Sequence, residues 1–228
     1  MIFKGHQKIS FIDYPSKICT VFFSGGCNFR CPYCHNSSLV YNKGNKLSEK
    51  YIYDFLDEKR NYLDAVCVSG GECTLFPEEL YNFLKKIKEV GFLTKIDTNG
   101  TNPQIVEKLI NDNLLDYIAM DIKAPFDKYH LVAGVDVDIN LIENSIEIIK
   151  NANIQSEFRT TVCKELLTHD DIEKISTMID GAQRYVIQNF KDNDMVLAGK
   201  DKFTPYSNDD LTYICNKIKN KFKHCNIR

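Results

Sequence analysis

The 228-residue sequence contains no long uninterrupted hydrophobic run. No stretch approaches the roughly 18 apolar residues of a membrane-spanning helix, and residues 1–15 lack the apolar core of a secretory signal peptide. Charge of one sign is not in excess either, because 29 Lys and Arg face 31 Asp and Glu. A nucleic-acid or anionic-membrane binder held by bulk charge is therefore not expected. We expect a cytoplasmic protein with neither of these partners.

Nine cysteines indicate metal or redox chemistry more than a disulfide framework, because thiols stay reduced in the cytoplasm. Three of them, Cys27, Cys31 and Cys34, are spaced C-x3-C-x2-C within SGGCNFRCPYCHN at residues 24–36. The other cysteines form no second C-x2-C pair, and His35, adjacent to Cys34, cannot easily turn back onto the same metal. A structural zinc site, which needs four ligands, is therefore disfavoured.

Three thiolates suit an iron–sulfur centre with one open position. A cubane [4Fe–4S] cluster is normally held by four Cys thiolates. With three protein ligands, one iron is left open to a substrate or cofactor, and an open position is typical of catalytic metal sites. The sequence offers no Ser/His/Asp triad and no catalytic carboxylate pair. We therefore expect no catalytic residue beyond the cluster and a bound small molecule.

Short β-rich runs alternate with helical patterns along the whole chain. The runs lie at residues 18–23, 65–70, 93–97, 117–123, 157–162 and 184–190. Six strand–helix units in alternation predict a parallel sheet with helices outside, either an open doubly wound sheet or a barrel-like (β/α)6 arrangement. No linker or low-complexity tract divides the chain, so a single domain over residues 1–228 is expected.

Polar residues gather where these strands end. In either architecture the active site lies at the carboxyl ends of the strands. The candidate residues outside the cysteine loop are Gly70, Gly71, Glu72, Asp97, Thr98, Asn99, Asp121, Lys123, Arg159 and Gln188. Segments far apart in the sequence are thus expected to meet at one rim.

Four motifs together resemble the radical S-adenosylmethionine (SAM) enzymes. They are C-x3-C-x2-C with Tyr33 before its last cysteine, SGGE at 69–72, DTNG at 97–100 and MDIK at 120–123. The resemblance implies a partial (β/α)6 TIM-like barrel of parallel strands with outer helices. It also implies a [4Fe–4S] cluster on Cys27, Cys31 and Cys34, and SAM whose methionine amino and carboxylate groups chelate the fourth iron.

The resemblance also implies roles for the residues around SAM. Tyr33 would contact the adenine, and Gly70 and Gly71 would let the backbone approach the ligand closely. Glu72 would accept a hydrogen bond from the methionine ammonium. This chain has Cys73 where the family usually has proline after GGE, a departure that bears on the subfamily.

A monovalent cation is a further cofactor that the resemblance implies. Asp97, Thr98 and Asp121 match positions that bind such an ion beside the SAM carboxylate, and hard oxygen ligands suit it. Lys123 and Arg159 would steady the SAM carboxylate or an incoming peptide.

Several of these residues also have structural explanations. The glycines suit an ordinary turn after a strand, and Tyr33 could be an aromatic brace for the loop. DTNG, including Asn99, suits a turn cap. Asp121 and Lys123 could form a simple salt bridge, and Gln188 is assigned to SAM binding from its rim position alone.

Three further sequence stretches resemble the activases of glycyl-radical enzymes. FIDYP at 11–15, CHN at 34–36 and QNF at 188–190 are most similar to the activating protein of anaerobic ribonucleoside-triphosphate reductase, and pyruvate formate-lyase activating enzymes share CHN, DTNG and D-x-K. The resemblance implies a glycyl-radical enzyme as protein substrate and a low-potential electron donor such as flavodoxin or ferredoxin. The alternatives are a radical SAM enzyme acting on a small molecule and a non-enzymatic metal-binding module.

Overall fold

A computed structural model describes residues 2–228, and it divides into two compact units. Each unit is assembled from separate stretches of chain. The first contains Met1–Asn28, Ser38–Thr98 and Gln104–Ile118, and the second contains Phe29–Ser37, Asn99–Pro103 and Ala119–Arg228. The predicted single domain stays a prediction, but neither unit is one continuous half of the sequence.

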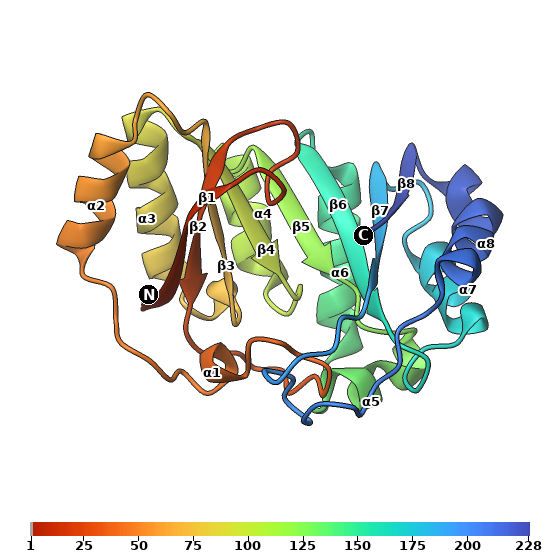
Figure 1. The fold of residues 1–228 in the computed structure, drawn as a ribbon. Coiled ribbons are helices and arrows are strands. Elements are labelled where there is room, and N and C mark those ends of the chain that lie inside the picture. The colour runs from red at the N-terminus through yellow and green to blue at the C-terminus, as the bar shows by residue number, and fades with distance from the viewer. Residues whose placement is uncertain (1) are drawn as a thin grey trace. The chain divides into compact units, whose positions relative to one another are not determined.

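Strands and helices alternate along the chain (Figure 1). The strands are β1 (Phe3–Ser10), β2 (Cys19–Ser24), β3 (Ala65–Gly70), β4 (Leu93–Thr98), β5 (Tyr117–Asp121), β6 (Gln155–Val162), β7 (Arg184–Asn189) and β8 (His224–Ile227). The α-helices are α1 (Ser37–Val40), α2 (Glu49–Glu58), α3 (Pro77–Val90), α4 (Pro103–Asn111), α5 (Tyr129–Ala133), α6 (Ile139–Asn151), α7 (His169–Met178) and α8 (Asn208–Ile218). The 3-10 turns are Cys73–Leu75, Phe126–Lys128 and Lys219–Lys221.

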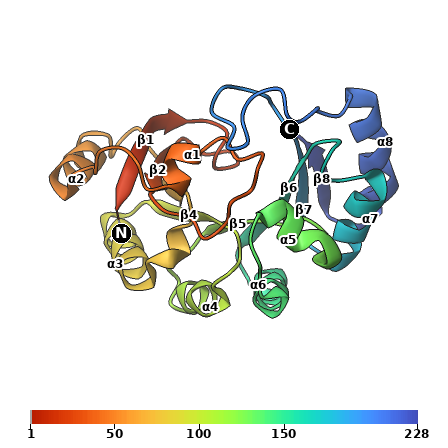
Figure 2. The same ribbon diagram turned by 90° about the horizontal axis from the view of Figure 1, so that it is seen from below.

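In the first unit, β2 pairs in parallel with β3, and β3 with β4. Strand β1 joins β2 in the antiparallel direction. Helices α2 and α3 run along the outside of these strands (Figure 2). Helix α3 begins at Pro77, is capped after Val90 by Gly91 in the left-handed conformation, and buries Leu80 and Leu84, as expected of a helix that starts with proline and is followed by glycine.

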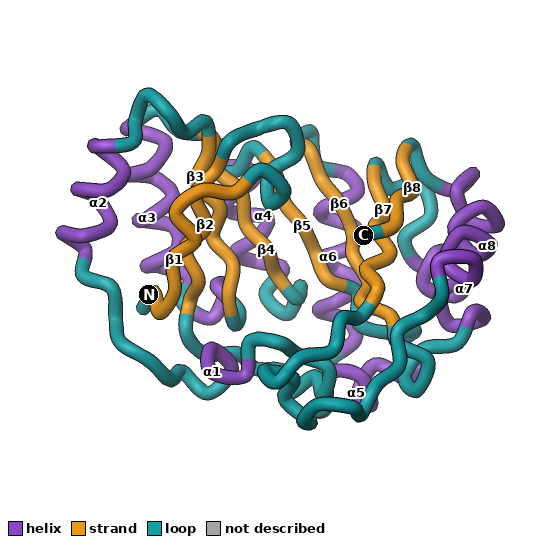
Figure 3. The backbone as a smooth tube through the Cα atoms, in the orientation of Figure 1, coloured by secondary structure: helices purple, strands orange, loops and turns teal. Residues whose placement is uncertain are grey.

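In the second unit, β6, β7 and β8 pair in parallel. Helix α7 opens with a capping box, in which Thr168 and Asp171 satisfy each other's backbone N–H groups. Asp171 is also paired with Lys128 at 2.8 Å. The 18 residues between β7 and α8, 190–207, contain no helix or strand and form a long loop (Figure 3).

The predicted α/β class with parallel strands and outer helices is confirmed, and the six predicted strands correspond to β2–β7. The first and last strands were missed. Strand β1 is mostly half-buried or exposed and has the polar sequence FKGHQKIS, while β8 has only four residues. Both lack the apolar run that marks a buried strand. No helix in the described residues is long and apolar enough to cross a membrane.

His6 on β1 gives the fold a pH-dependent contact. Its Nδ1 lies 2.9 Å from the Tyr51 hydroxyl, its Nε2 lies 2.7 Å from Thr20 Oγ1, and its ring stacks on Phe22. Burial, with a smaller contribution from the Lys8 charge, lowers the pKa of His6 to about 4.

We expect the free energy of unfolding to decrease as the pH falls from about 6.5, the ordinary histidine pKa, towards the folded value. In that window the unfolded chain binds a proton that the folded chain does not. Urea unfolding of the anaerobically purified wild type and of His6→Gln at several pH values measures this free energy. The variant should lose the part of the pH dependence that His6 contributes. His130→Gln, which changes an exposed histidine, is the control. An unchanged pH slope in His6→Gln would contradict the assignment.

Candidate functional site

The part of the cysteine loop in the second unit is held by the end of α5. The backbone N–H of Arg30 donates to the Ala133 carbonyl at 2.8 Å. The next residue, Gly134, ends α5 with a φ of +69°, and a Cβ there would lie 2.3 Å from the Arg30 carbonyl oxygen. Only glycine permits this approach, so α5 fixes the course of the loop between its first two cysteines.

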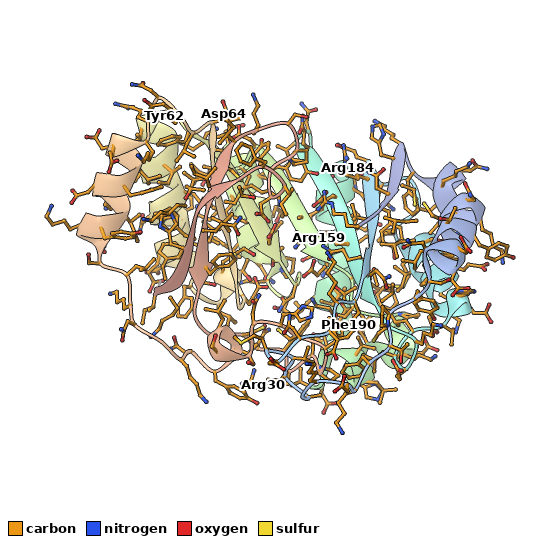
Figure 4. The ribbon with its side chains drawn as sticks, viewed as in Figure 1. Arg30, Tyr62, Asp64, Arg159, Arg184 and Phe190 are labelled. Carbon is orange, nitrogen blue, oxygen red and sulfur yellow. The ribbon has the colours of Figure 1, made fainter. Side chains whose placement is uncertain are left out.

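The same loop is held by the segment that follows β7. The backbone N–H of Leu197 donates to the Cys34 carbonyl at 2.9 Å. The His35 ring stacks on Phe190 with centroids 5.3 Å apart, and its Nε2 bonds to the Lys191 carbonyl. Figure 4 labels Arg30 and Phe190, which mark these two attachments. Two predicted motifs, CHN and QNF, are therefore in direct contact.

The chemistry of the three cysteines fits an iron–sulfur cluster. Among the described residues, none of the three cysteines forms a disulfide. Cys31 and Cys34 share one tight turn, in which the Cys34 N–H donates to the Cys31 carbonyl at 3.0 Å. The Asn36 N–H also lies 3.4 Å from Cys34 Sγ, a contact that would stabilise a thiolate ligand. Cys27 belongs to the first unit. The described residues contain no ready-made group of three metal-ligating side chains, so joint ligation stays a prediction.

The two glycines of SGGE are required by the packing of the first unit. Gly71 donates its N–H to the Ser24 carbonyl at 3.0 Å, and Glu72 donates to the Gly26 carbonyl at 2.8 Å. A Cβ on Gly71 would lie 1.9 Å from the Gly26 oxygen, and Gly70 has a φ of +121°. The turn explanation thus accounts for both glycines, and their approach to SAM stays a prediction.

Glu72 is buried and connects two predicted site segments. Its Oε1 accepts hydrogen bonds from the Thr74 N–H at 3.0 Å, the Thr74 hydroxyl at 2.6 Å and the Thr98 hydroxyl at 2.8 Å. The carboxylate therefore has a fixed position before any ligand binds. Such a group suits charge-assisted recognition of an ammonium.

Asn99 and Tyr33 support the structural explanations. The Asn99 Oδ1 accepts from the N–H and the hydroxyl of Thr101, at 3.1 and 2.8 Å, which makes DTNG a side-chain-supported turn. Tyr33 is buried, burial raises the pKa of its phenol well above the ordinary value, and its hydroxyl has no hydrogen-bond partner among residues 2–228. Gln188 is half-buried and accepts from the Thr161 hydroxyl at 3.5 Å. Direct contacts of these residues with SAM stay predictions.

In the second unit, the predicted site residue Asp121 forms ion pairs with Lys123 and Arg159. Asp121 Oδ1 accepts from Arg159 Nε at 2.8 Å, and Asp121 Oδ2 lies 3.1 Å from Lys123 Nζ (Arg159 is labelled in Figure 4). Burial by itself lowers the pKa of Lys123, but Asp121 and other acidic neighbours reverse the effect and raise that pKa above its ordinary value. Both cations are charged at neutral pH, and the predicted salt bridge is present.

Lys95 on β4 is a buried charged residue beside the predicted site residue Asp97, and the sequence analysis did not single it out. Its side chain is only 1% exposed, and its Nζ lies 2.9 Å from Asp97 Oδ1. The same ammonium donates to the Asp13 carbonyl at 2.6 Å. The available signal was a lysine two residues before an aspartate in a strand expected to be buried, since buried lysines are rare unless paired.

Comparison with known proteins places this arrangement in a family. The Radical SAM superfamily profile matches residues 21–179, which include the cysteine loop, most of β2 and the strands β3–β6. The chain therefore belongs to the radical SAM superfamily. Its cofactors are a [4Fe–4S] cluster and SAM.

Two relatives narrow the comparison. A Methanocaldococcus jannaschii protein named for glycyl-radical enzyme activation, MJ1227, is 37% identical over 194 residues, which cover 83% of this chain and 80% of the relative. The pyruvate formate-lyase-activating enzyme of Clostridium pasteurianum is 29% identical over 180 residues, 76% of this chain and 74% of the relative. Both of these relatives are named as activating enzymes, and each aligns with more than two thirds of this chain.

Among solved structures, SuiB of Streptococcus suis superposes with a TM-score of 0.68 at 17% identity. The match covers 90% of this chain and 48% of SuiB, so this chain spans about half the length of that protein. At this identity the likeness shows the fold alone, and it agrees with the predicted partial barrel.

Replacing any of Cys27, Cys31 or Cys34 with Ala should abolish the cluster, because removal of one thiolate leaves a second iron without a protein ligand. Iron and sulfide analysis with visible absorption of anaerobically purified protein measures this. Cys163→Ala, which removes a buried thiol elsewhere, is the control and should retain the cluster. A full iron complement in Cys31→Ala would show that the ligand assignment is wrong.

Cys73→Pro should retain both the cluster and SAM cleavage. Cys73 begins a 3-10 turn, where proline is tolerated, and Glu72 before it is extended (φ −138°, ψ 113°), as a residue before proline prefers. Burial raises the pKa of the Cys73 thiol well above its ordinary value, so the thiol stays neutral and is a poor ligand. Loss of iron in this variant, measured beside wild type, would make Cys73 a ligand instead.

Proposed function

We propose that this protein is a glycyl-radical-enzyme activase, which removes a hydrogen atom from the Cα of a glycine in a partner enzyme. When bound, the reduced cluster and SAM supply the 5′-deoxyadenosyl radical for that step. The observation that carries the proposal is the 37% identity to a relative named for this activity, over 83% of the chain. The enzyme class itself follows from the superfamily, which removes the non-enzymatic alternative.

The chain's own residues would hold SAM by charge complementarity. Glu72, held in position by Thr74 and Thr98, would accept a hydrogen bond from the ammonium group of the SAM methionine. Lys123 and Arg159 would attract the methionine carboxylate, because both stay charged beside Asp121. Cys27, Cys31 and Cys34 would hold the cluster. Pre-formed groups of this kind bind a ligand without first having to be ordered.

An anaerobic ribonucleotide reductase is the partner we favour. The support is the FIDYP, CHN and QNF resemblance, and two of these motifs touch through His35 and Phe190. A low-potential donor such as flavodoxin or ferredoxin would supply the electron. The expected cytoplasmic location stays a prediction. A radical SAM enzyme acting on a small molecule is the remaining alternative.

Incubation of the reduced holoenzyme with SAM and the candidate reductase should generate a glycyl radical on the reductase. Its electron paramagnetic resonance signal should be a doublet from the remaining α-hydrogen, and deuterium placed at that α-carbon should appear in 5′-deoxyadenosine. A reductase with that glycine changed to alanine is the control and should show no such doublet. Transfer of label from a small metabolite, with no radical on any candidate partner, would refute the activase proposal and leave the superfamily assignment intact.

A further inference from the structure

We infer that Lys95 takes the place of a monovalent cation at Asp97, so that SAM binding by this enzyme does not require potassium or sodium. The inference depends on the proposed placement of Asp97 beside bound SAM. It corrects one of the cofactors that the sequence resemblance implies, and it assigns Lys95 as a positioning residue.

The geometry of β4 brings the two charges together. Lys95 and Asp97 are two residues apart on a strand, so their side chains project from the same face. Lys95 Nζ lies 2.9 Å from Asp97 Oδ1, and the side chains are 1% and 12% exposed. The pair is thus shielded from water on its lysine side.

The Lys95 ammonium is well satisfied where it lies. It donates to the Asp13 carbonyl at 2.6 Å and lies 5.4 Å from the centroid of the Tyr117 ring. An anionic carboxylate, a carbonyl dipole and an aromatic face together stabilise a buried cation. A buried lysine with these partners is fixed in one position rather than exchanging with solvent.

A second cation at Asp97 would meet this ammonium. A metal ion bonded to the same carboxylate would lie within a few ångströms of Nζ, and like charges at that separation repel strongly where water is excluded. In the second unit Asp121, the other carboxylate assigned to the ion, is already neutralised by Lys123 and Arg159. Each carboxylate therefore has a protein cation from its own unit, and neither presents an unbalanced negative charge.

For SAM binding, the consequence is that the Asp97 carboxylate has a cationic partner without an added metal ion. Lys95 supplies the positive charge 2.9 Å from Asp97 Oδ1, and the adjacent Thr98 hydroxyl donates to Glu72 at 2.8 Å. Lys95 also connects the end of β4 to Asp13 in the FIDYP stretch. Loss of Lys95 would remove the ammonium beside Asp97 Oδ1, and an external cation could then take its place.

The test is SAM affinity of the anaerobic holoenzyme, measured by calorimetry in potassium chloride and in choline chloride at equal ionic strength. Wild type should bind SAM within about twofold in the two salts, because equal ionic strength gives equal screening. Lys95→Met should bind at least about tenfold more weakly in choline, about 1.4 kcal/mol, and recover in potassium. Wild-type binding that itself falls about tenfold in choline would overturn the inference.

Two controls separate positioning from general stability. Lys88→Met breaks another ion pair of the first unit, to Asp116 at 2.9 Å, and should show no salt specificity. If Lys95→Met does not fold, the double variant Lys95→Met/Asp97→Asn replaces it, because it removes both charges and leaves the pair neutral. The SAM affinity of the double variant should be the same in both salts. Potassium dependence in that double variant would show that Asp97 is not the group Lys95 neutralises and would overturn the inference.

Thallium NMR of the wild-type holoenzyme with SAM provides a readout independent of any variant and of the partner protein. Thallous ion replaces potassium at protein sites, so the inference expects no SAM-dependent bound signal in wild type and a new one in Lys95→Met. A SAM-dependent bound ion in wild type would overturn it. None of these measurements uses glycyl-radical formation, so failure of the activase proposal would be seen separately.

Discussion

The close backbone approach between the loops that follow β2 and β3 is the constraint on which the candidate site residues of the first unit depend. Gly71 lies so near the Gly26 carbonyl that a single Cβ would overlap it, and the Glu72 N–H bonds to that same carbonyl. Gly26 immediately precedes Cys27, so the position of the first cysteine and that of the buried carboxylate are set by one contact. Side-chain chemistry is added to a backbone arrangement that only glycine allows.

Each acidic residue among the site candidates has hydrogen-bond or ion-pair partners within its own unit. Glu72 is held by threonine hydroxyls, Asp97 by Lys95, and Asp121 by Lys123 and Arg159. Buried charges are stable only when paired and hydrogen-bonded. The pairs therefore contribute to folding as well as to the proposed recognition of SAM, and a substitution in one of them is expected to change both.

Much of the fold was accessible from sequence because the signals were local. The strands β2–β7 are apolar runs, and the Thr168–Asp171 capping box lies within four residues. Strand β1 was missed because antiparallel pairing with β2 lets it keep a polar face. Lys95 was missed because its carbonyl partner, Asp13, is 82 residues away in sequence. Neither antiparallel partners nor tertiary charge pairs leave a periodic signature in a single sequence.

The attachment of the cysteine loop to the segment after β7 has a consequence for the order of assembly in the cell. His35 bonds to a carbonyl 156 residues later in the chain, and Cys34 is held by Leu197. A ribosome adds residues one at a time from the N-terminus, so the loop emerges long before the segment that shapes it. Iron and sulfide delivered to a nascent chain would meet an unshaped loop, and the loop in its final form is available only after residues 190–197 have been made.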